Sequence, residues 1–231
     1  MSADVPSTNS QLTSGERDPR WETVVFDLDG TLVDTIGLIV ASYQHATETV
    51  LGQAWDARRI RSYIGRPLIE CFREGAPDHA DALFAAYTEW NEAHPHLIAP
   101  YAGVDRMLAR LHSAGVRVAV ATSKRREPAL MALERCGIAG LVPVLVTMED
   151  TDVHKPRPEP LLLALDRAGG VVTSAAYVGD AAVDLRAARA AAMPGVGVTW
   201  GAGEREAIEA ERPYAVCHSV DALAEVLLPK R

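Results

Sequence analysis

Two aspartates, one residue apart, follow an apolar segment near the start of the chain. Residues 26–35 read FDLDGTLVDT, in which Asp27 and Asp29 are followed directly by Gly30. Alternate residues of an extended chain point to the same side, so both carboxylates can face one ligand. Glycine has no Cβ and lets a ligand approach the backbone closely. The segment is therefore typical of a site that binds a metal ion or a phosphate group.

Polar residues also follow three later apolar segments. Thr122 and Ser123 come after VRVAVA, Lys155 lies in the proline-rich loop MEDTDVHKPRPEP, and Asp180 and Asp184 come after AAYVG. If these segments are parallel strands, their carboxyl ends meet at one edge of the sheet, where ligands bind in open α/β folds. We therefore expect these polar side chains to converge on one site.

Four aspartates held close together would raise one another's pKa. Mg²⁺ removes this conflict, because it prefers carboxylate and carbonyl oxygens and keeps positions open for water and phosphate. A compact ammonium group also suits a point contact to phosphate or carboxylate, and Lys155 is one of only three lysines in the chain. The residues thus predict a magnesium site with room for a phosphate group.

Short apolar segments predict the strands that position these residues. They have the length and the β-branched content of strands buried on both faces. The segments are residues 23–28, 116–122, 141–147, 175–180, 195–200 and, more weakly, 214–217. Helix-like segments separate the later ones, and two of these end at the capping glycines Gly115 and Gly137. The alternation predicts an α/β, doubly wound, Rossmann-like core with a mostly parallel sheet.

The interval between the first two predicted strands is much longer than the others and shows no convincing strand. Its apolar residues have helical spacing. We therefore predict an all-helical cap, residues 35–100, inserted into an α/β core formed by residues 21–34 and 101–231. Residues 1–20 are polar, with little apolar content, and predict a disordered tail.

Composition and charge argue against several functional classes. The chain has 231 residues, 48% of them hydrophobic, and a formal net charge of −8 without a basic stripe. Nucleic acid and anionic membrane surfaces are therefore not expected as partners. The three cysteines match no disulfide framework and no zinc-site spacing, and no segment has the pattern of a membrane span or a signal peptide. These features predict a cytoplasmic protein, and nothing in the sequence indicates its oligomeric state.

Together, these segments resemble the haloacid dehalogenase-like superfamily, in which four motifs follow one another in this order. DLDGTLVDT is similar to the first motif, VAVATSK to the second, HKPRPEP to the third and YVGDAAVDLRAARAA to the fourth. The resemblance covers about residues 22–228, and the inserted helices look like the superfamily's helical cap. The segment YIGRPLIECF is similar to that of phosphoglycolate phosphatases. The resemblance implies a Mg²⁺-dependent phosphatase that hydrolyses a small, phosphoglycolate-like phosphate monoester.

The resemblance also implies a role for each catalytic residue. Asp27 would be the nucleophile that forms an aspartyl-phosphate intermediate. Asp29 would be the general acid and base, protonating the leaving oxygen and later activating water. Thr122 would hydrogen-bond the transferring phosphoryl group, and Lys155 would offset the negative charge of Asp27 and the phosphate.

Phosphate and metal ligands are implied in the same way. The phosphate-binding residues would be Gly30, Thr122, Ser123 and Lys155. The Mg²⁺ ligands would be Asp27, the carbonyl of Asp29, and Asp180, with Asp184 as a ligand or directly behind one. Two neighbours depart from the common pattern, since Ser123 stands where many relatives have asparagine and Ala181 where serine or threonine is frequent. These departures bear on specificity more than on activity.

Other activities on the same fold remain as alternatives. Asp29 argues against a dehalogenase, which generally lacks the second aspartate, and the absence of lysine from residues 34–103 argues against a phosphonate-cleaving enzyme. A sugar phosphomutase similar to β-phosphoglucomutase is the main alternative, followed by a pyrophosphatase and a non-catalytic binding protein. Arg66, on an expected cap loop, is the candidate for binding a distal anion of the substrate. A surface arginine at a helix start is an equally good interpretation.

Overall fold

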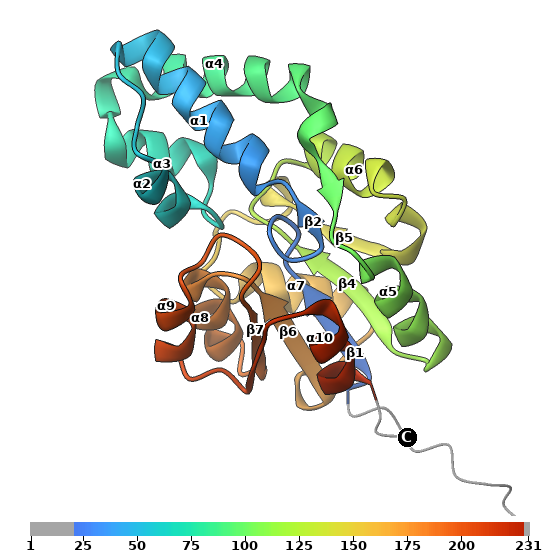
Figure 1. Cartoon of the computed structure of the whole chain (residues 1–231). Helices are drawn as coiled ribbons and strands as arrows, with labels where there is room; N and C mark the ends of the chain where they lie inside the picture. Colours follow the sequence, from blue (N-terminus) through green and yellow to red (C-terminus); the bar gives the residue numbers. More distant parts are fainter. Residues whose placement is uncertain (1–20, 229–231) are drawn as a thin grey trace, which may run out of the picture.

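One sheet of six strands forms the centre of the molecule (Figure 1). The computed structural model describes residues 21–228, so the tail predicted at residues 1–20 lies outside the described residues. The strands are β1 (Thr23–Phe26), β4 (Arg117–Ala121), β5 (Val144–Val146), β6 (Ala175–Gly179), β7 (Gly195–Val198) and β8 (Ala215–Cys217). Their order is β5-β4-β1-β6-β7-β8, and every neighbouring pair is parallel. Each strand lies within a segment that the sequence predicts as one, which confirms the doubly wound core.

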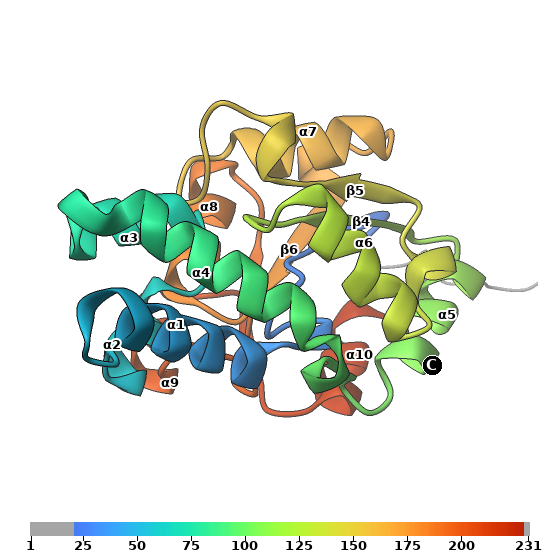
Figure 2. The same cartoon turned by 90° about the horizontal axis from the view of Figure 1, so that it is seen from above.

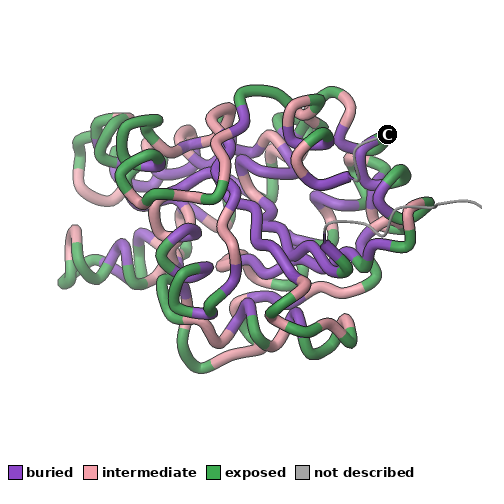
Figure 3. Tube along the Cα trace, turned by 90° about the horizontal axis from the view of Figure 1, so that it is seen from below, coloured by how far each residue is buried: buried purple, intermediate pink, exposed green. Residues whose placement is uncertain are grey.

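Helices cover both faces of this sheet because its strands are apolar on both faces. In β1, Val24 and Phe26 belong to the apolar cluster on the side of α5, α6 and α10, whereas Val25 belongs to the cluster formed with α7 and α8. Figure 2 shows α7 on one side of the sheet and α5 and α10 on the other. These helices are α5 (Val104–Ser113), α6 (Arg126–Arg135), α7 (Glu159–Arg167), α8 (Ala182–Ala190) and α10 (Val220–Leu227). The central strands β1 and β6 are buried along their whole length, and in Figure 3 the helices alternate between buried and exposed residues.

The strand order creates a switch point between β1 and β6. From β1 the chain proceeds through β4 to β5 on one side, and then crosses to β6, β7 and β8 on the other. Connections therefore leave in opposite directions at the carboxyl ends of β1 and β6. This arrangement leaves a crevice between the two strand ends, and open α/β sheets bind ligands in such a crevice. Asp27 directly follows β1, and Asp180 directly follows β6.

Four helices are inserted after β1, as predicted. They are α1 (Ile36–Leu51), α2 (Ala57–Tyr63), α3 (Leu68–Gly75) and α4 (Ala80–Ala93). Their inward residues form a separate apolar cluster around Tyr43 and Phe72, which also includes Ala202 from the loop after β7. The separate cluster supports a division into core and cap, although the boundaries at residues 34–35 and 100–101 stay a prediction.

Several short elements were not predicted from the sequence. The insertion is joined to the core by two antiparallel strands, β2 (Val33–Asp34) and β3 (Ala99–Pro100), which are too short to produce a periodic pattern. Helix α9 (Arg205–Ala210) has one buried residue, Ile208. Short 3₁₀ helices span Pro77–His79, Pro95–Leu97, Ala139–Leu141, Met148–Asp150 and Val172–Ser174. No helix in the described part of the chain has the length and apolar character that crossing a membrane requires.

Candidate active site

Lys155 connects the ends of β1 and the β6–α8 region at the switch point. Its Nζ donates hydrogen bonds to Asp27 Oδ1 and to Asp184 Oδ1, each at 2.7 Å, and lies 3.3 Å from the hydroxyl of Tyr177. The lysine and both aspartate side chains are at most 3% exposed. A buried ammonium held between two carboxylates is expensive to assemble and is more often found at a functional site than elsewhere.

The charges in this cluster strongly affect one another. Burial opposes the charge on Lys155, but the carboxylates of Asp184 and Asp27 hold the pKa of the lysine well above its usual value. Burial raises the pKa of Asp27 to about 7, against the opposing effect of Lys155. Burial and the charges of Asp184 and Asp27 raise the pKa of Asp180 well above its usual value. When ionised, the three carboxyl groups carry more negative charge than Lys155 neutralises, and without a further cation burial favours the protonated forms of Asp27 and Asp180.

Three of the predicted metal ligands meet in this cluster. Asp27, Asp180 and Asp184 are buried, and each offers a carboxylate oxygen within 4.8 Å of those of the other two. An all-oxygen donor set with excess negative charge fits a hard divalent cation such as Mg²⁺. Protein donors orient the carboxylates: the hydroxyl of Thr31 donates to Asp180 Oδ1 at 3.2 Å, and the backbone amide of Ala202 donates to Asp180 Oδ2 at 2.6 Å.

Gly30 lies against Asp180 with no space for a side chain. Its φ of +81° is in the left-handed region, and a Cβ at this position would overlap the Asp180 carboxylate. The backbone amide of Gly30 donates to the carbonyl of Val33 at 2.9 Å. Glycine is required here because the backbone packs directly against the acidic cluster. The sequence suggests a different reason, namely that a ligand approaches the backbone at this position.

Asp29 faces different partners from Asp27. Its Oδ1 accepts hydrogen bonds from the hydroxyl of Thr35 at 2.5 Å and from Lys124 Nζ at 3.0 Å. Lys124 is a site residue that the sequence interpretation missed. It directly follows the predicted phosphate-binding pair and is one of only three lysines in the chain, and those two signals could have identified it.

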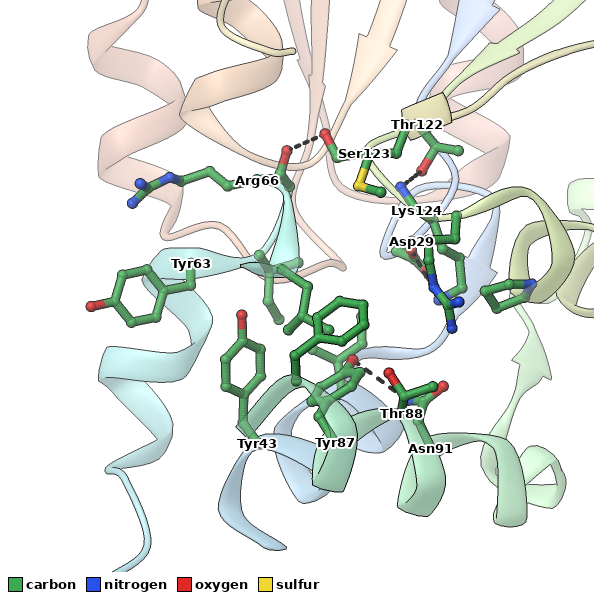
Figure 4. Close-up of a pocket in the computed structure, with 18 of the residues that line it drawn as sticks. Asp29, Tyr43, Tyr63, Arg66, Tyr87, Thr88, Asn91, Thr122, Ser123 and Lys124 are labelled. Atoms are coloured by element: carbon green, nitrogen blue, oxygen red, sulfur yellow. Dashed lines mark hydrogen bonds and ion pairs between the residues drawn. The ribbon is translucent and has the colours of Figure 1, made fainter. Parts of the chain in front are cut away.

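Thr122 and Ser123 lie at the carboxyl end of β4, as predicted. The hydroxyl of Thr122 accepts a hydrogen bond from the backbone amide of Lys124 at 3.2 Å, which fixes the turn beside Asp29. Ser123 donates to the carbonyl of Gly65 at 2.8 Å (Figure 4). Ser123 thus connects the core to a loop of the inserted helices, a contact that sequence alone does not predict.

A cavity lies between the inserted helices and the carboxyl ends of the strands (Figure 4). Asp27, Asp29, Thr122 and Ser123 line its core side. Arg66 also lines it, but the arginine side chain extends away from the cavity in Figure 4 and forms an ion pair with Glu74 at 2.6 Å. The structure therefore brings the predicted residues of the core together and places Arg66 at the margin.

Comparisons with known proteins agree with this arrangement. The family profile "Haloacid dehalogenase-like hydrolase" matches residues 24–198. A relative named "Pyrophosphatase PpaX" from Bacillus pumilus is 35% identical over 192 residues, which are 83% of this chain and 89% of the relative. The crystal structures of a "predicted phosphatase" from Clostridium acetobutylicum and of a "hydrolase" from Pseudomonas syringae align with TM-scores of 0.81 and 0.80. Both are 25% identical, and both alignments cover 89% of this chain and 97% of the other. The chain therefore belongs to the haloacid dehalogenase-like hydrolase family that its four motifs resemble.

Proposed function

We propose that this hydrolase is a Mg²⁺-dependent phosphatase that cleaves small phosphate monoesters through a phosphorylated Asp27. The contacts of Lys155 carry the proposal, because the ammonium occupies Oδ1 of Asp27 and leaves Oδ2 as the attacking oxygen. Lys155, together with a Mg²⁺ ion held by the acidic cluster, would offset the negative charge of Asp27 and of the bound phosphoryl group. Phosphoryl transfer depends mostly on such positioning and charge neutralisation.

The proposed reaction has two steps that share one proton carrier. Asp27 Oδ2 attacks phosphorus, the bond from phosphorus to the ester oxygen breaks, and Asp29 gives its proton to the leaving alkoxide. Asp29 then takes a proton from a water molecule that attacks the phosphorus, and the bond from phosphorus to Asp27 Oδ2 breaks, which releases phosphate and restores the carboxylate. Thr35 and Lys124 orient Asp29 through the hydrogen bonds they donate to Oδ1.

Asp27, Asp180 and the carbonyl of Asp29 would hold the Mg²⁺ ion, and Asp184 would support them. The ion would supply positive charge to the phosphoryl oxygens in the transition state. Asp184 Oδ2 accepts the backbone amide of Ala181 at 3.0 Å, so the residue also fixes the first turn of α8. Gly30, Thr122 and Ser123 would surround the phosphate together with Lys155.

The test is phosphate release from a panel of phosphate esters, with Mg²⁺ and with EDTA. Asp27→Asn should abolish release from every ester, because an amide oxygen is a far weaker nucleophile and loses the charge that Lys155 pairs. Asp81→Asn, an exposed aspartate on α4, is the matched control and should leave the rate unchanged. Acid quenching during turnover should trap phosphate on the wild-type chain. Unchanged release by Asp27→Asn, or equal rates in EDTA and Mg²⁺, would contradict the mechanism.

The substrate within this class is a separate question. The phosphoglycolate-like substrate implied by the motifs stays a prediction, and it requires a cation for the second anionic group. The name of the Bacillus pumilus relative makes pyrophosphate a second candidate, so both compounds belong in the panel. A cytoplasmic location is part of the same proposal. It is supported by the three cysteines, which are free, because disulfides are rare in reducing compartments.

A further inference from the structure

The wall that the inserted helices contribute to the cavity is mostly apolar. It contains Ile64, Leu68 and Phe84, together with Tyr63 and Tyr87 (Figure 4). Leu68 and Phe84 are only half-buried and lie at the edge of the cap's apolar cluster. Removing apolar surface from water stabilises a complex. This wall therefore favours a ligand group that covers these side chains with apolar surface.

Positive charge in the cavity is already neutralised by the protein. Among the described residues, the cations that line the cavity each contact a carboxylate. The pairs are Arg66 with Glu74 at 2.6 Å, Lys124 with Asp29 at 3.0 Å, and Arg125 with Glu92 at 3.0 Å. Arg125 also lies 5.7 Å from the ring centroid of Phe84. A second anion on the substrate would have to share or compete for a cation that already contacts a carboxylate.

Carboxylates also line the same space, which makes a second anion less favourable still. Asp27, Asp29 and Glu92 belong to the cavity wall, and Asp27 is buried, so a second anion held near it is unfavourable. The carboxylate of phosphoglycolate and the second phosphate of pyrophosphate would both meet this cost. A neutral leaving group would not.

We propose that the substrate is the phosphate monoester of a neutral, apolar alcohol about the size of one ring. Leu68 and Phe84 would contact the ring. The cavity volume of about 100 Å³ is large enough for one ring, because about 10–15 Å³ on the same measure holds one water molecule. The inference rests on the proposed phosphatase activity and names the leaving group for it.

The first test compares phosphate esters of primary alcohols at pH 7 with Mg²⁺. Benzyl phosphate, ethyl phosphate and 2-phosphoglycolate all release an alkoxide from a CH₂ group, so differences in kcat/KM report mainly the contacts of the leaving group. Pyrophosphate is included as the doubly anionic case. We expect benzyl phosphate to exceed both 2-phosphoglycolate and pyrophosphate in kcat/KM by at least tenfold, with ethyl phosphate between.

The second test removes the aromatic contact. Phe84→Ala should lower kcat/KM for benzyl phosphate by about tenfold and for ethyl phosphate by less than twofold, mostly through KM, because the lost contact is made before and during the reaction. Leu130→Ala, an exposed apolar residue on α6 outside the cavity, is the matched control and should change neither value. The substrate series on the wild-type protein decides the question if Phe84→Ala does not fold.

The outcomes separate the two proposals. Phosphate release that is fastest from 2-phosphoglycolate or pyrophosphate would overturn the neutral leaving group and leave the phosphatase mechanism intact. An equal loss on benzyl and ethyl phosphate in Phe84→Ala would also overturn it. No Mg²⁺-dependent release from any ester would overturn both.

Discussion

Replacing Lys155 with methionine tests what holds the acidic cluster together. Methionine has nearly the same length and no charge, so the substitution removes the ammonium with little change in packing. Asp27 and Asp184 would then lose the donor that contacts each of them at 2.7 Å in a site where the lysine is 1% exposed. Two buried carboxylates would face each other and Asp180 without a cation.

The expected loss of stability can be worked out from these contacts. At an effective dielectric constant of about 20, unit charges 2.7 Å apart attract by roughly 6 kcal/mol, and desolvation cancels much of this in the intact pair. Removing one partner of a buried pair costs about 3–5 kcal/mol, because the remaining charge is uncompensated. For a chain of 231 residues this corresponds to a decrease in Tm of roughly 6–20 °C.

The assay is thermal unfolding of Lys155→Met in EDTA and in Mg²⁺. We expect the full decrease in EDTA and a partial recovery in Mg²⁺, because the ion binds the folded state and supplies the missing positive charge. Lys124→Met is the matched control. Its ion pair with Asp29 is longer, at 3.0 Å, and the two side chains are 11% and 14% exposed, so its cost should be smaller than that of Lys155→Met.

Two results would refute this reasoning. One is an equal decrease in Tm for Lys155→Met and Lys124→Met, which would show that burial of the charge does not determine the cost. The other is a Lys155→Met protein as stable in EDTA as the wild type, which would show that the aspartates do not need the ammonium when no metal is bound.

Three further outcomes are expected. Ser123→Ala should lower the free energy of unfolding by about 1 kcal/mol in urea denaturation, because the carbonyl of Gly65 loses its donor; Ser123→Thr should retain part of it. Burial raises the pKa of Asp150, but hydrogen bonds from Thr147 and Arg167 outweigh this effect and lower the pKa from 3.8 to about 2. The resulting stability is present above pH 3.8 and is lost as the pH falls through 2, so the difference in unfolding free energy between wild type and Asp150→Asn should shrink from pH 6 to pH 3. Ala181→Ser should raise Tm in scanning calorimetry by roughly 2–4 °C, because residue 181 is the extended N-cap of α8 and alanine provides no hydroxyl for the helix amides; an unchanged Tm would contradict it.

The core of the site was predictable because its residues directly follow buried strands. Asp27 and Asp180 come immediately after β1 and β6, and parallel strands bring their carboxyl ends to the same edge whatever the loops do. Lys155 was predictable only from its motif, since nothing in a proline-rich loop shows that the ammonium lies 2.7 Å from Asp27, 128 residues away.

The cap side of the site was much less predictable. The helical spacing of residues 35–100 indicated helices, but it did not show which side chains face the core. Arg66 was a reasonable candidate for anion binding by sequence, yet its long side chain pairs with Glu74 on the neighbouring helix. An exposed arginine gains little energy from one ionic partner over another. Which partner Arg66 takes therefore depends on which groups lie near it in the fold, and the residue type alone does not reveal this.

Local sequence was therefore sufficient for the strands, the inserted helices and the acidic residues at the strand ends, because periodicity and strand direction act over a few residues. The contact of Lys124 with Asp29 spans 95 residues, and that of Ser123 with Gly65 spans 58. The first depends on the pairing of β1 with β4, and the second on how the inserted helices pack against the core. The same packing forms the apolar wall of the cavity and neutralises its cations, and these two properties determine which phosphate ester we expect the enzyme to accept.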